Sequence, residues 1–340
     1  MFKNISKIKI KIIVSVVIAI LAVVFLVVCY LLNSNKDNKN NVIRIGYQPY
    51  WSLHSNMIQT MKRLKLLEKR GYNPEYVSFL SGPPLNQAMV SENLDAGFGG
   101  NLPAVSLIAS GAGVKIIAET VKSYRQAIIV DKEKSKEIKT VKDLAGKKIG
   151  LVVGSGSHYY FYKTLKDNGM DLKDVNLVNL AVTEQSQALL LHQIDACDPW
   201  EPWTTKIEKN GSGVIISQTE KEAGFPCYAY VRGKFVDANP KAVLAFVEAM
   251  QEALVYMQKN YDQTCGWVAE ETKEEQSIIY DSSKNDKILE IGENIKPRSS
   301  TLEHLTDVGN FALSQGLIKD IPDFSKAVDT SFVDKVLKIK

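Results

Sequence analysis

The feature that most constrains the fold is an alternation of strand-like and helical segments that occurs twice. The first series contains three strand-like segments with a helical segment after each of the first two. In chain order they are VIRIGYQ, SNMIQTMKRLKLLEKRG (ending at Gly71), EYVSFL, PLNQAMVSEN and LDAGFGG. The second series has the same order: KKIGLVVG, SHYYFYKTLKDNG, VNLVNL, SQALLLHQ and IDACDPW. Strands that alternate with helices predict parallel sheets with right-handed crossovers.

The two series also share residues at a shift of 100 positions. Five identities support the match: Leu80, Gln87, Ala88, Asp95 and Ala96 recur as Leu180, Gln187, Ala188, Asp195 and Ala196. Each series therefore has the same acidic–alanine pair in its third strand. We interpret them as two similar α/β lobes.

The remaining segments predict how the lobes are divided. Residues 42–127 and 226–340 form lobe 1, and residues 128–225 form lobe 2. Helices from Asn239 onward, including one around 299–315, are expected to pack on lobe 1. The chain then crosses between the lobes twice, which makes a hinge. Ligands of open α/β sheets bind at the carboxyl ends of strands, so both lobes would face one cleft.

Residues 1–41 are expected to be a membrane anchor or lipoprotein signal followed by a polar linker. Ile12 to Leu32 is an apolar run without charge, long enough to span a bilayer. The lysines before it hold the N-terminus inside, so the body lies on the extracytoplasmic side of the cell membrane. The run is either an uncleaved anchor or a signal with Cys29 as the acylated residue.

Composition excludes several classes of function. The net charge is +4, but no basic patch is interleaved with aromatics, so nucleic acid is not an expected partner. Cys197, Cys227 and Cys265 lack the spacing of zinc ligands. A Cys197–Cys227 disulfide is possible, and buried free thiols are the default expectation.

GSGSH, from Gly154 to His158, follows the first strand of lobe 2 and carries the sharpest binding signal. Gly156 permits a tight turn, Ser155 and Ser157 offer hydroxyls, and Ser157 is expected to cap the helix that starts near His158. Free N–H groups at a helix N-terminus favour an anion. The segment is either an anion site or only a capped turn.

Other strand ends supply similar turns. Three loops of lobe 1 carry the remaining candidates: GYQPYW with Gln48, Tyr50 and Trp51, SGPP with Ser81 and Gly82, and GGN with Gly100 and Asn101. Three helix N-termini that point at one cleft predict a small anionic ligand, bound without dedicated arginines.

DPWEPW ends the third strand of lobe 2. We expect Trp200 to be exposed in the cleft and to form an apolar wall with Tyr47, Tyr50 or Trp51. Asp198 and Glu201 have two interpretations: they lie at a helix N-terminus, which stabilises their charge, or one of them binds a ligand ammonium group. Neither is favoured by the sequence alone.

An enzyme is not expected. Adjacent Ser157 and His158 cannot adopt a serine–histidine geometry, GSGSH lacks the GxSxG order, and no HExxH spacing occurs. We therefore predict no catalytic residue, no cofactor and no metal.

Four stretches resemble one family, the solute-binding proteins of sulfonate/nitrate/taurine ABC importers: LSGPPLNQAMVSENLDAGFGGNLPA, TVKDLAGKKIGLVVGSGSH, IDACDPWEPW and KFVDANPKAVLAFVEAM. The resemblance implies a type II periplasmic-binding-protein fold, an α/β architecture with mostly parallel sheets and helices on both faces. It also implies delivery of the ligand to a membrane permease powered by an ATPase. The family often has an acidic residue near Asn101, and the neutral amide here leaves the charge of the ligand open.

The leading hypothesis is therefore an extracytoplasmic binding protein for a small organosulfonate, an alkanesulfonate or taurine, or a similar anion. One alternative keeps the fold and binds nitrate, or a heterocycle of the thiamine-pyrimidine or riboflavin type. Another is an anchored enzyme or sensor without a transporter.

Overall fold

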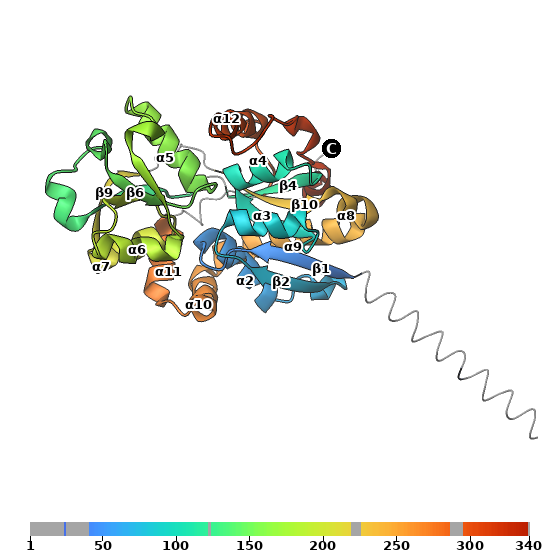
Figure 1. Ribbon diagram of the computed structural model, residues 1–340. Helices are drawn as coiled ribbons and strands as arrows, with labels where there is room; N and C mark the ends of the chain where they lie inside the picture. Colours follow the sequence, from blue (N-terminus) through green and yellow to red (C-terminus); the bar gives the residue numbers. More distant parts are fainter. Residues whose placement is uncertain (1–23, 25–40, 122–123, 219–225, 286–294, 339–340) are drawn as a thin grey trace, which may run out of the picture. The chain divides into compact units, whose positions relative to one another are not determined.

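The computed structural model describes residues 41–121, 124–218, 226–285 and 295–338, together with Val24 (Figure 1). The expected anchor or lipoprotein signal, including Cys29, lies outside the described residues. Within the described part of the chain, none of the helices combines the length and the apolar character needed to cross a membrane.

The first sheet has the strand order β2–β1–β3–β10–β4. β1 is parallel to β3, whereas β10 is antiparallel to both of its neighbours. The strands are β1 (Val42–Tyr47), β2 (Asn73–Ser78), β3 (Ala96–Gly100), β4 (Val114–Val121) and β10 (Cys227–Arg232). The helices between the first four are α2 (Ser52–Arg63), α3 (Gly82–Val90) and α4 (Asn101–Ala109).

The second sheet has the order β7–β6–β8–β5–β9, which repeats the first sheet position by position. β6 is parallel to β7 and β8, and β5 is antiparallel to β8 and β9. The strands are β5 (Ala127–Asp131), β6 (Lys148–Leu151), β7 (Asn176–Asn179), β8 (Ala196–Cys197) and β9 (Gly213–Gln218), with helices α5 (Gly156–Asp167), α6 (Val182–Leu190) and α7 (Trp203–Asn210). The predicted two-lobed α/β class is confirmed.

The C-terminal helices contact both groups of elements. α9 packs on α2, α10 on α2, α11 on α2 and α7, and α12 on α4. Their bounds are α8 (Gly233–Ala238), α9 (Pro240–Lys259), α10 (Tyr261–Thr272), α11 (Gln276–Asn285), α12 (Thr301–Ser314) and α13 (Ser331–Leu337). Short 3₁₀ turns are η1 (Glu68–Arg70), η2 (Lys132–Lys136), η3 (Val141–Leu144), η4 (Leu172–Asp174) and η6 (Phe324–Lys326). We propose that each sheet with its own helices is one lobe.

The first helix is shorter than the sequence predicts. Helical periodicity was expected to continue to Gly71, but α2 ends at Arg63. Lys65 adopts a left-handed conformation with φ 53°, and the Leu66 N–H donates to the Met61 carbonyl at 3.0 Å. This is a Schellman-type C-terminus. It turns the chain so that Leu66 and Leu67 are fully buried. The free energy gained by burying these two side chains exceeds the free energy that further turns of the helix would give.

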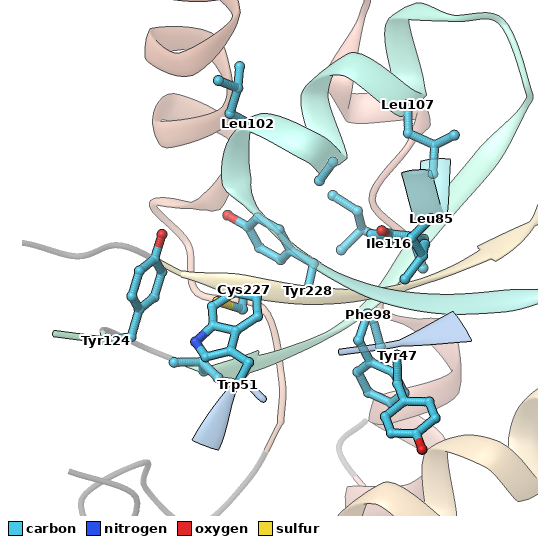
Figure 2. Close-up of a cluster of buried hydrophobic side chains, with 14 of the residues drawn as sticks. Tyr47, Trp51, Leu85, Phe98, Leu102, Leu107, Ile116, Tyr124, Cys227 and Tyr228 are labelled. Carbon is cyan, nitrogen blue, oxygen red and sulfur yellow. The ribbon is translucent and has the colours of Figure 1, made fainter. Parts of the chain in front are cut away.

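Buried aromatic and aliphatic side chains fill the space around the first sheet (Figure 2). Phe98 of β3 lies among Tyr47, Leu85 and Ile116 in this cluster. Gly46 of β1 and Gly150 of β6 each leave room for a leucine or isoleucine side chain. An added Cβ would lie 2.6 Å from Leu94 Cδ1 at Gly46 and 2.8 Å from Ile194 Cδ1 at Gly150. The two lobes thus use the same packing at matching positions.

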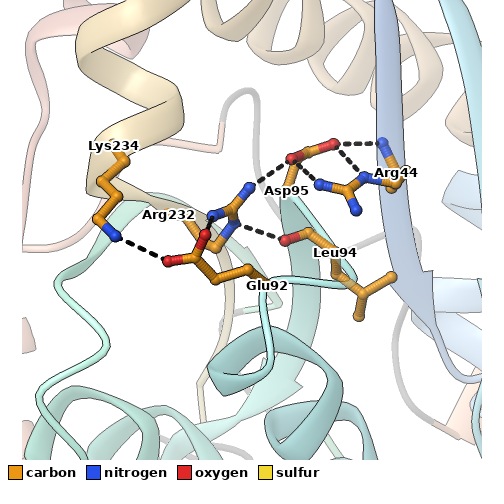
Figure 3. A network of polar contacts seen from close by, with 6 residues as sticks. All are labelled: Arg44, Glu92, Leu94, Asp95, Arg232 and Lys234. Atoms are coloured by element: carbon orange, nitrogen blue, oxygen red, sulfur yellow. Dashed lines mark hydrogen bonds and ion pairs between the residues drawn. The ribbon is translucent and has the colours of Figure 1, made fainter.

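The acidic residue of the repeat is a structural clamp (Figure 3). Asp95 Oδ2 accepts from the backbone N–H and Nε of Arg44, both at 3.0 Å, and Oδ1 accepts from Arg44 Nη2 and Arg232 Nη2, both at 2.8 Å. Arg232 Nε also donates to the Leu94 carbonyl at 2.7 Å. The carboxylate therefore holds β1, β3 and β10 in register.

Asp195 repeats this clamp in the second sheet. Its Oδ2 accepts from the Lys148 backbone N–H at 2.6 Å, and Lys134 takes the place of the arginines. The preceding helices end alike, since Glu92 and His192 both have positive φ (58° and 53°). The flanking charges are reversed, because Glu92 pairs with Arg232 whereas His192 pairs with Asp131.

The cysteines confirm the default expectation. Cys197, Cys227 and Cys265 are free and buried. The Cys197–Cys227 disulfide that the sequence left open is therefore not formed. The two residues lie in β8 and β10, which belong to different sheets.

Replacing Asp95 with Asn should lower the free energy of unfolding at pH 7 by about 2–4 kcal/mol, because two arginines lose their shared anion. Burial raises the pKa of Asp95, but the hydrogen bonds from Arg44 and Arg232 outweigh it, and the net pKa is lowered. A lowered folded pKa gives stability that is present above about pH 4 and is lost as the pH falls through the folded value. The gap between variant and wild type should therefore close in acid.

Urea unfolding at pH 7 and pH 3 measures both effects. Asp195→Asn is the matched control and should cost less, because its side chain is 16% exposed against 5% for Asp95. Equal stability of wild type and Asp95→Asn at pH 7, or a gap that widens in acid, would contradict the clamp.

Candidate functional site

A small cavity of about 20 Å³ lies where loops of both lobes meet. Its walls consist of uncharged residues: Gln48, Trp51, Gly82, Gly100, Pro103, Tyr124, Ser155, Gly156, Ser157 and Trp200. The first five belong to the first lobe, Tyr124 lies between β4 and β5, and the last four belong to the second lobe. Eight of these ten residues are among the candidates from the sequence.

Four helices begin at this cavity. Trp51 precedes α2, Gly82 starts α3, Gly100 precedes α4, and Gly156 starts α5. At none of these four N-termini does the residue before the helix cap it with its side chain, although in α4 the Leu102 N–H donates to Asn101 Oδ1 at 2.7 Å. The remaining N–H groups of the first turns and the partial positive charges therefore lie around one place, which favours an anion. The sequence predicted three of these N-termini and missed that of α2.

The GSGSH turn differs from the prediction in its details. The helix starts at Gly156 rather than near His158, so Ser157 is inside it and is not the cap. Ser155 Oγ donates to the Val152 carbonyl at 2.7 Å, and Ser157 Oγ accepts from Gln126 Nε2 at 3.0 Å. Both hydroxyls are thus engaged within the protein. The N–H groups of Gly154, Ser155 and His158 also have acceptors, which leaves those of Gly156 and Ser157 as the donors without a partner among the described residues.

The histidines near the site are neutral at physiological pH. Burial lowers the pKa of His54 to about 3 and that of His158 to about 4. The pKa of His304 is also about 4, again mainly through burial. His54 lies behind Trp51, with ring centroids 4.5 Å apart. His158 lies outside the cavity lining and packs against Phe311.

The expectation that Trp200 is exposed was wrong. Its side chain lines the cavity but is only 6% exposed, and its backbone pairs with Gln126 across an isolated antiparallel β-bridge. Trp203 is 7% exposed and lies against Tyr50 and beneath the Lys206 ammonium group. Tyr50 contacts this second tryptophan and does not line the cavity.

Glu201 is buried and already has partners. Its carboxylate pairs with Arg125 at 3.0 Å and accepts from the Thr205 N–H at 3.1 Å. Burial raises the pKa of Glu201, and the Arg125 charge opposes this shift. The contact with Thr205, in the first turn of α7, matches the helix-terminus interpretation rather than an ammonium contact.

Asp198 is fully buried, and neither carboxylate oxygen has a hydrogen-bond partner among the described residues. Burial raises its pKa well above the usual range. It lies outside the cavity lining, as do Ser81 and Asn101. Asn101 Nδ2 lies 3.1 Å from His304 Nε2, so that amide is engaged with α12.

Sequence reasoning missed two wall residues, Pro103 and Tyr124. Tyr124 lies in the crossing segment, and its ring packs on Trp51 with centroids 5.1 Å apart. Its hydroxyl lies 2.1 Å from the position of a Cβ on Gly156, so only glycine fits there without a shift of the tyrosine. A pattern of strand ends cannot reveal a residue that reaches the site from a linker.

Metal ligands do not gather anywhere in the described part of the chain: no group of three or more His, Cys, Asp or Glu could hold an ion. The donors at the cavity are backbone N–H groups and neutral side chains. Such a set suits an oxyanion and does not suit a cation.

Solved structures identify the fold. The alkanesulfonate-binding protein SsuA from Xanthomonas axonopodis pv. citri, bound to MOPS, is 20% identical with a TM-score of 0.76, over 85% of this chain and 98% of that chain. The desulfurization enzyme DSZB is 15% identical with a TM-score of 0.67, over 87% of this chain and 99% of that chain. The chain therefore has the periplasmic-binding-protein fold, which the sequence resemblance had implied, and this fold also occurs in an enzyme.

Sequence comparison then gives the family. A putative aliphatic sulfonates-binding protein from Bacillus subtilis is 26% identical over 94% of this chain and 96% of its own length. Residues 86–264 match the family model described as NMT1/THI5 like. This match covers more than half of the 340 residues, and the chain belongs to the NMT1/THI5-like family.

Glu201→Gln tests whether this carboxylate serves the fold or the ligand. We expect the free energy of unfolding to fall by about 1–3 kcal/mol, because Arg125 loses one of the carboxylate partners that it has among the described residues, Glu201 and Glu208. The affinities for taurine and for ethanesulfonate should both stay within about threefold of wild type, a change below 1 kcal/mol. Thermal unfolding and calorimetric titration measure the two effects. A loss of affinity confined to taurine would instead assign Glu201 to the amine.

Proposed function

We propose that this protein is the extracytoplasmic substrate-binding component of an ABC importer, and that it captures a small alkanesulfonate. The observation that carries the proposal is the convergence of four uncapped helix N-termini on one uncharged cavity. A sulfonate keeps its negative charge at all physiological pH values and offers three acceptor oxygens to such donors. Trp51, Tyr124 and Trp200 supply apolar surface for its alkyl group.

The charges around the cavity favour an alkanesulfonate over taurine. Taurine carries an ammonium group, which needs a carboxylate when it is buried. No carboxylate lines the described cavity, and Glu201 is already paired with Arg125. The names of the relatives support the same ligand class, since one is called an aliphatic sulfonates-binding protein and another an alkanesulfonate-binding protein.

The arrangement supports binding without chemistry. The Ser155 hydroxyl donates within the turn, the Ser157 hydroxyl is paired with Gln126, and His158 Nδ1 accepts from the Gly154 N–H at 3.4 Å. No nucleophile–base pair is therefore formed at this turn. We extend the proposal to anchoring through residues 1–41, which the apolar run Ile12–Leu32 predicts. We also extend it to delivery of the ligand to a membrane permease driven by an ATPase, as the family resemblance implies.

Ligand entry requires movement. The cavity has a volume of about 20 Å³, which is room for about one water molecule. A sulfonate group needs more space, so the side chains or loops around it must move apart on binding. Hinge motion of two lobes is a common means of doing so.

Calorimetric titration of residues 42–340 against ethanesulfonate, taurine, nitrate and a pyrimidine precursor tests the function. We expect the tightest binding for ethanesulfonate and weaker binding for taurine. Absence of heat with every sulfonate would overturn the proposal, and binding of the pyrimidine alone would assign the site to a heterocycle.

Gly156→Ala tests the location of the site. The added methyl group must displace the Tyr124 hydroxyl, so sulfonate affinity should fall at least about tenfold, equivalent to 1.4 kcal/mol. Stability should change little, because the far end of a tyrosine can shift. Gly266→Ala in α10, where a Cβ meets only Gln276 at 3.5 Å, is the control and should bind as wild type does. Unchanged affinity in Gly156→Ala would contradict a ligand at the α5 N-terminus.

A further inference from the structure

Trp51 occupies the point where α2 begins. It is the residue before the first helical turn, with an extended backbone (φ −96°, ψ 107°), and its side chain is 5% exposed. The ring lines the cavity beside Gly100: Trp51 Cη2 lies 3.5 Å from the position of a Cβ on Gly100, an ordinary van der Waals distance. Sequence analysis assigned this ring to an apolar wall.

The indole N–H of Trp51 is buried, and it has no hydrogen-bond acceptor among the residues that the structure describes. An indole nitrogen can only donate, and buried donors are nearly always paired in folded proteins. The rings packed on Trp51 do not pair with this N–H. His54 Nε2 contacts Thr120 Oγ1 at 2.9 Å, His54 Nδ1 has no partner among the described residues, and the face of Tyr124 is a weak acceptor.

Trp51 is a wall residue of the cavity, and Figure 2 shows its nitrogen on the edge of the indole ring nearer to Tyr124, another wall residue. The wall contains no carboxylate, and its neutral oxygens, among them those of Gln48 and Ser155, do not pair with this nitrogen. An oxygen of a ligand bound in the cavity would supply the missing acceptor.

We infer that Trp51 Nε1–H donates a hydrogen bond to an oxygen of the bound sulfonate, and that Trp51 is a specificity-determining residue as well as an apolar wall. This inference rests on the proposed function. The indole adds one directional, uncharged donor to the N–H groups of the four helices. It would reject ligands that place an apolar group at this position, because the buried donor would stay unpaired.

Proton–nitrogen NMR of the ¹⁵N-indole-labelled protein tests the inference directly. The chain has four tryptophans, and the signal missing from Trp51→Phe identifies Trp51. On addition of ethanesulfonate, the Trp51 indole proton should shift downfield and exchange more slowly with solvent. In titrations, Trp51→Phe should bind about 10- to 100-fold more weakly, the range for a hydrogen bond to a charged group.

Trp203→Phe is the matched control. Trp203 also has a buried indole nitrogen without a partner among the described residues, but it lies outside the cavity lining. It should bind ethanesulfonate as wild type does. If wild type binds ethanesulfonate while the Trp51 proton is unmoved, or while Trp51→Phe and Trp203→Phe bind equally, the inference is overturned and the proposed function stands. If wild type gives no heat with any sulfonate, both fall together.

Discussion

The carboxylate that precedes the third strand of each sheet fixes the strands on either side of it. Asp95 connects β1, β3 and β10, and Asp195 connects β6 and β8 to the turn that carries Lys134. Both carboxylates lie at the start of their strand, whereas the cavity lies at the other end, beyond Gly100. The ionic contacts and the ligand donors are thus at opposite ends of β3. This separation keeps the charges of both carboxylate clamps away from the proposed site, where the donors are neutral.

The proposed site has little net charge near it, because the surrounding histidines are neutral and Glu201 is paired. His54, His158 and His304 are neutral through burial, and Glu201 is matched by Arg125. Helix N-termini in such a dry environment interact strongly with an anion, since little water screens them. Neutral donors also leave the energy of binding independent of pH across the physiological range.

The C-terminal helices join the two halves of the site. In α12, Phe311 packs on the aromatic rings of α5, Asp307 accepts from Tyr159, and the helix also packs on α4. On α10 and α11, Glu271 pairs with Lys62 of α2, and Asn285 donates to Thr205 of α7 at 3.0 Å. α4, α5 and α2 all begin at the cavity. Separation of the lobes must therefore break or stretch contacts that these helices make.

Much of this architecture could be predicted from the sequence, because periodicity and the repeat report directly on strands and crossover helices. The strand-end loops led to eight of the ten wall residues for the same reason. Other features depend on tertiary contacts that no local pattern encodes. Tyr124 reaches the cavity from a crossing segment, Trp200 forms a backbone bridge with Gln126, and Arg125 pairs with Glu201 from 76 residues away. The unpaired Trp51 nitrogen was equally hidden, since only the packed structure shows which donors lack acceptors.

In the proposed site, uncharged donors select the negative charge of the ligand. Calorimetry with methanesulfonate and with dimethyl sulfone, a neutral molecule in which a methyl group replaces one oxygen, tests this selection. We expect binding of methanesulfonate and no detectable heat with the sulfone. Equal affinity for the two would contradict it, because shape and apolar contact alone would then explain binding.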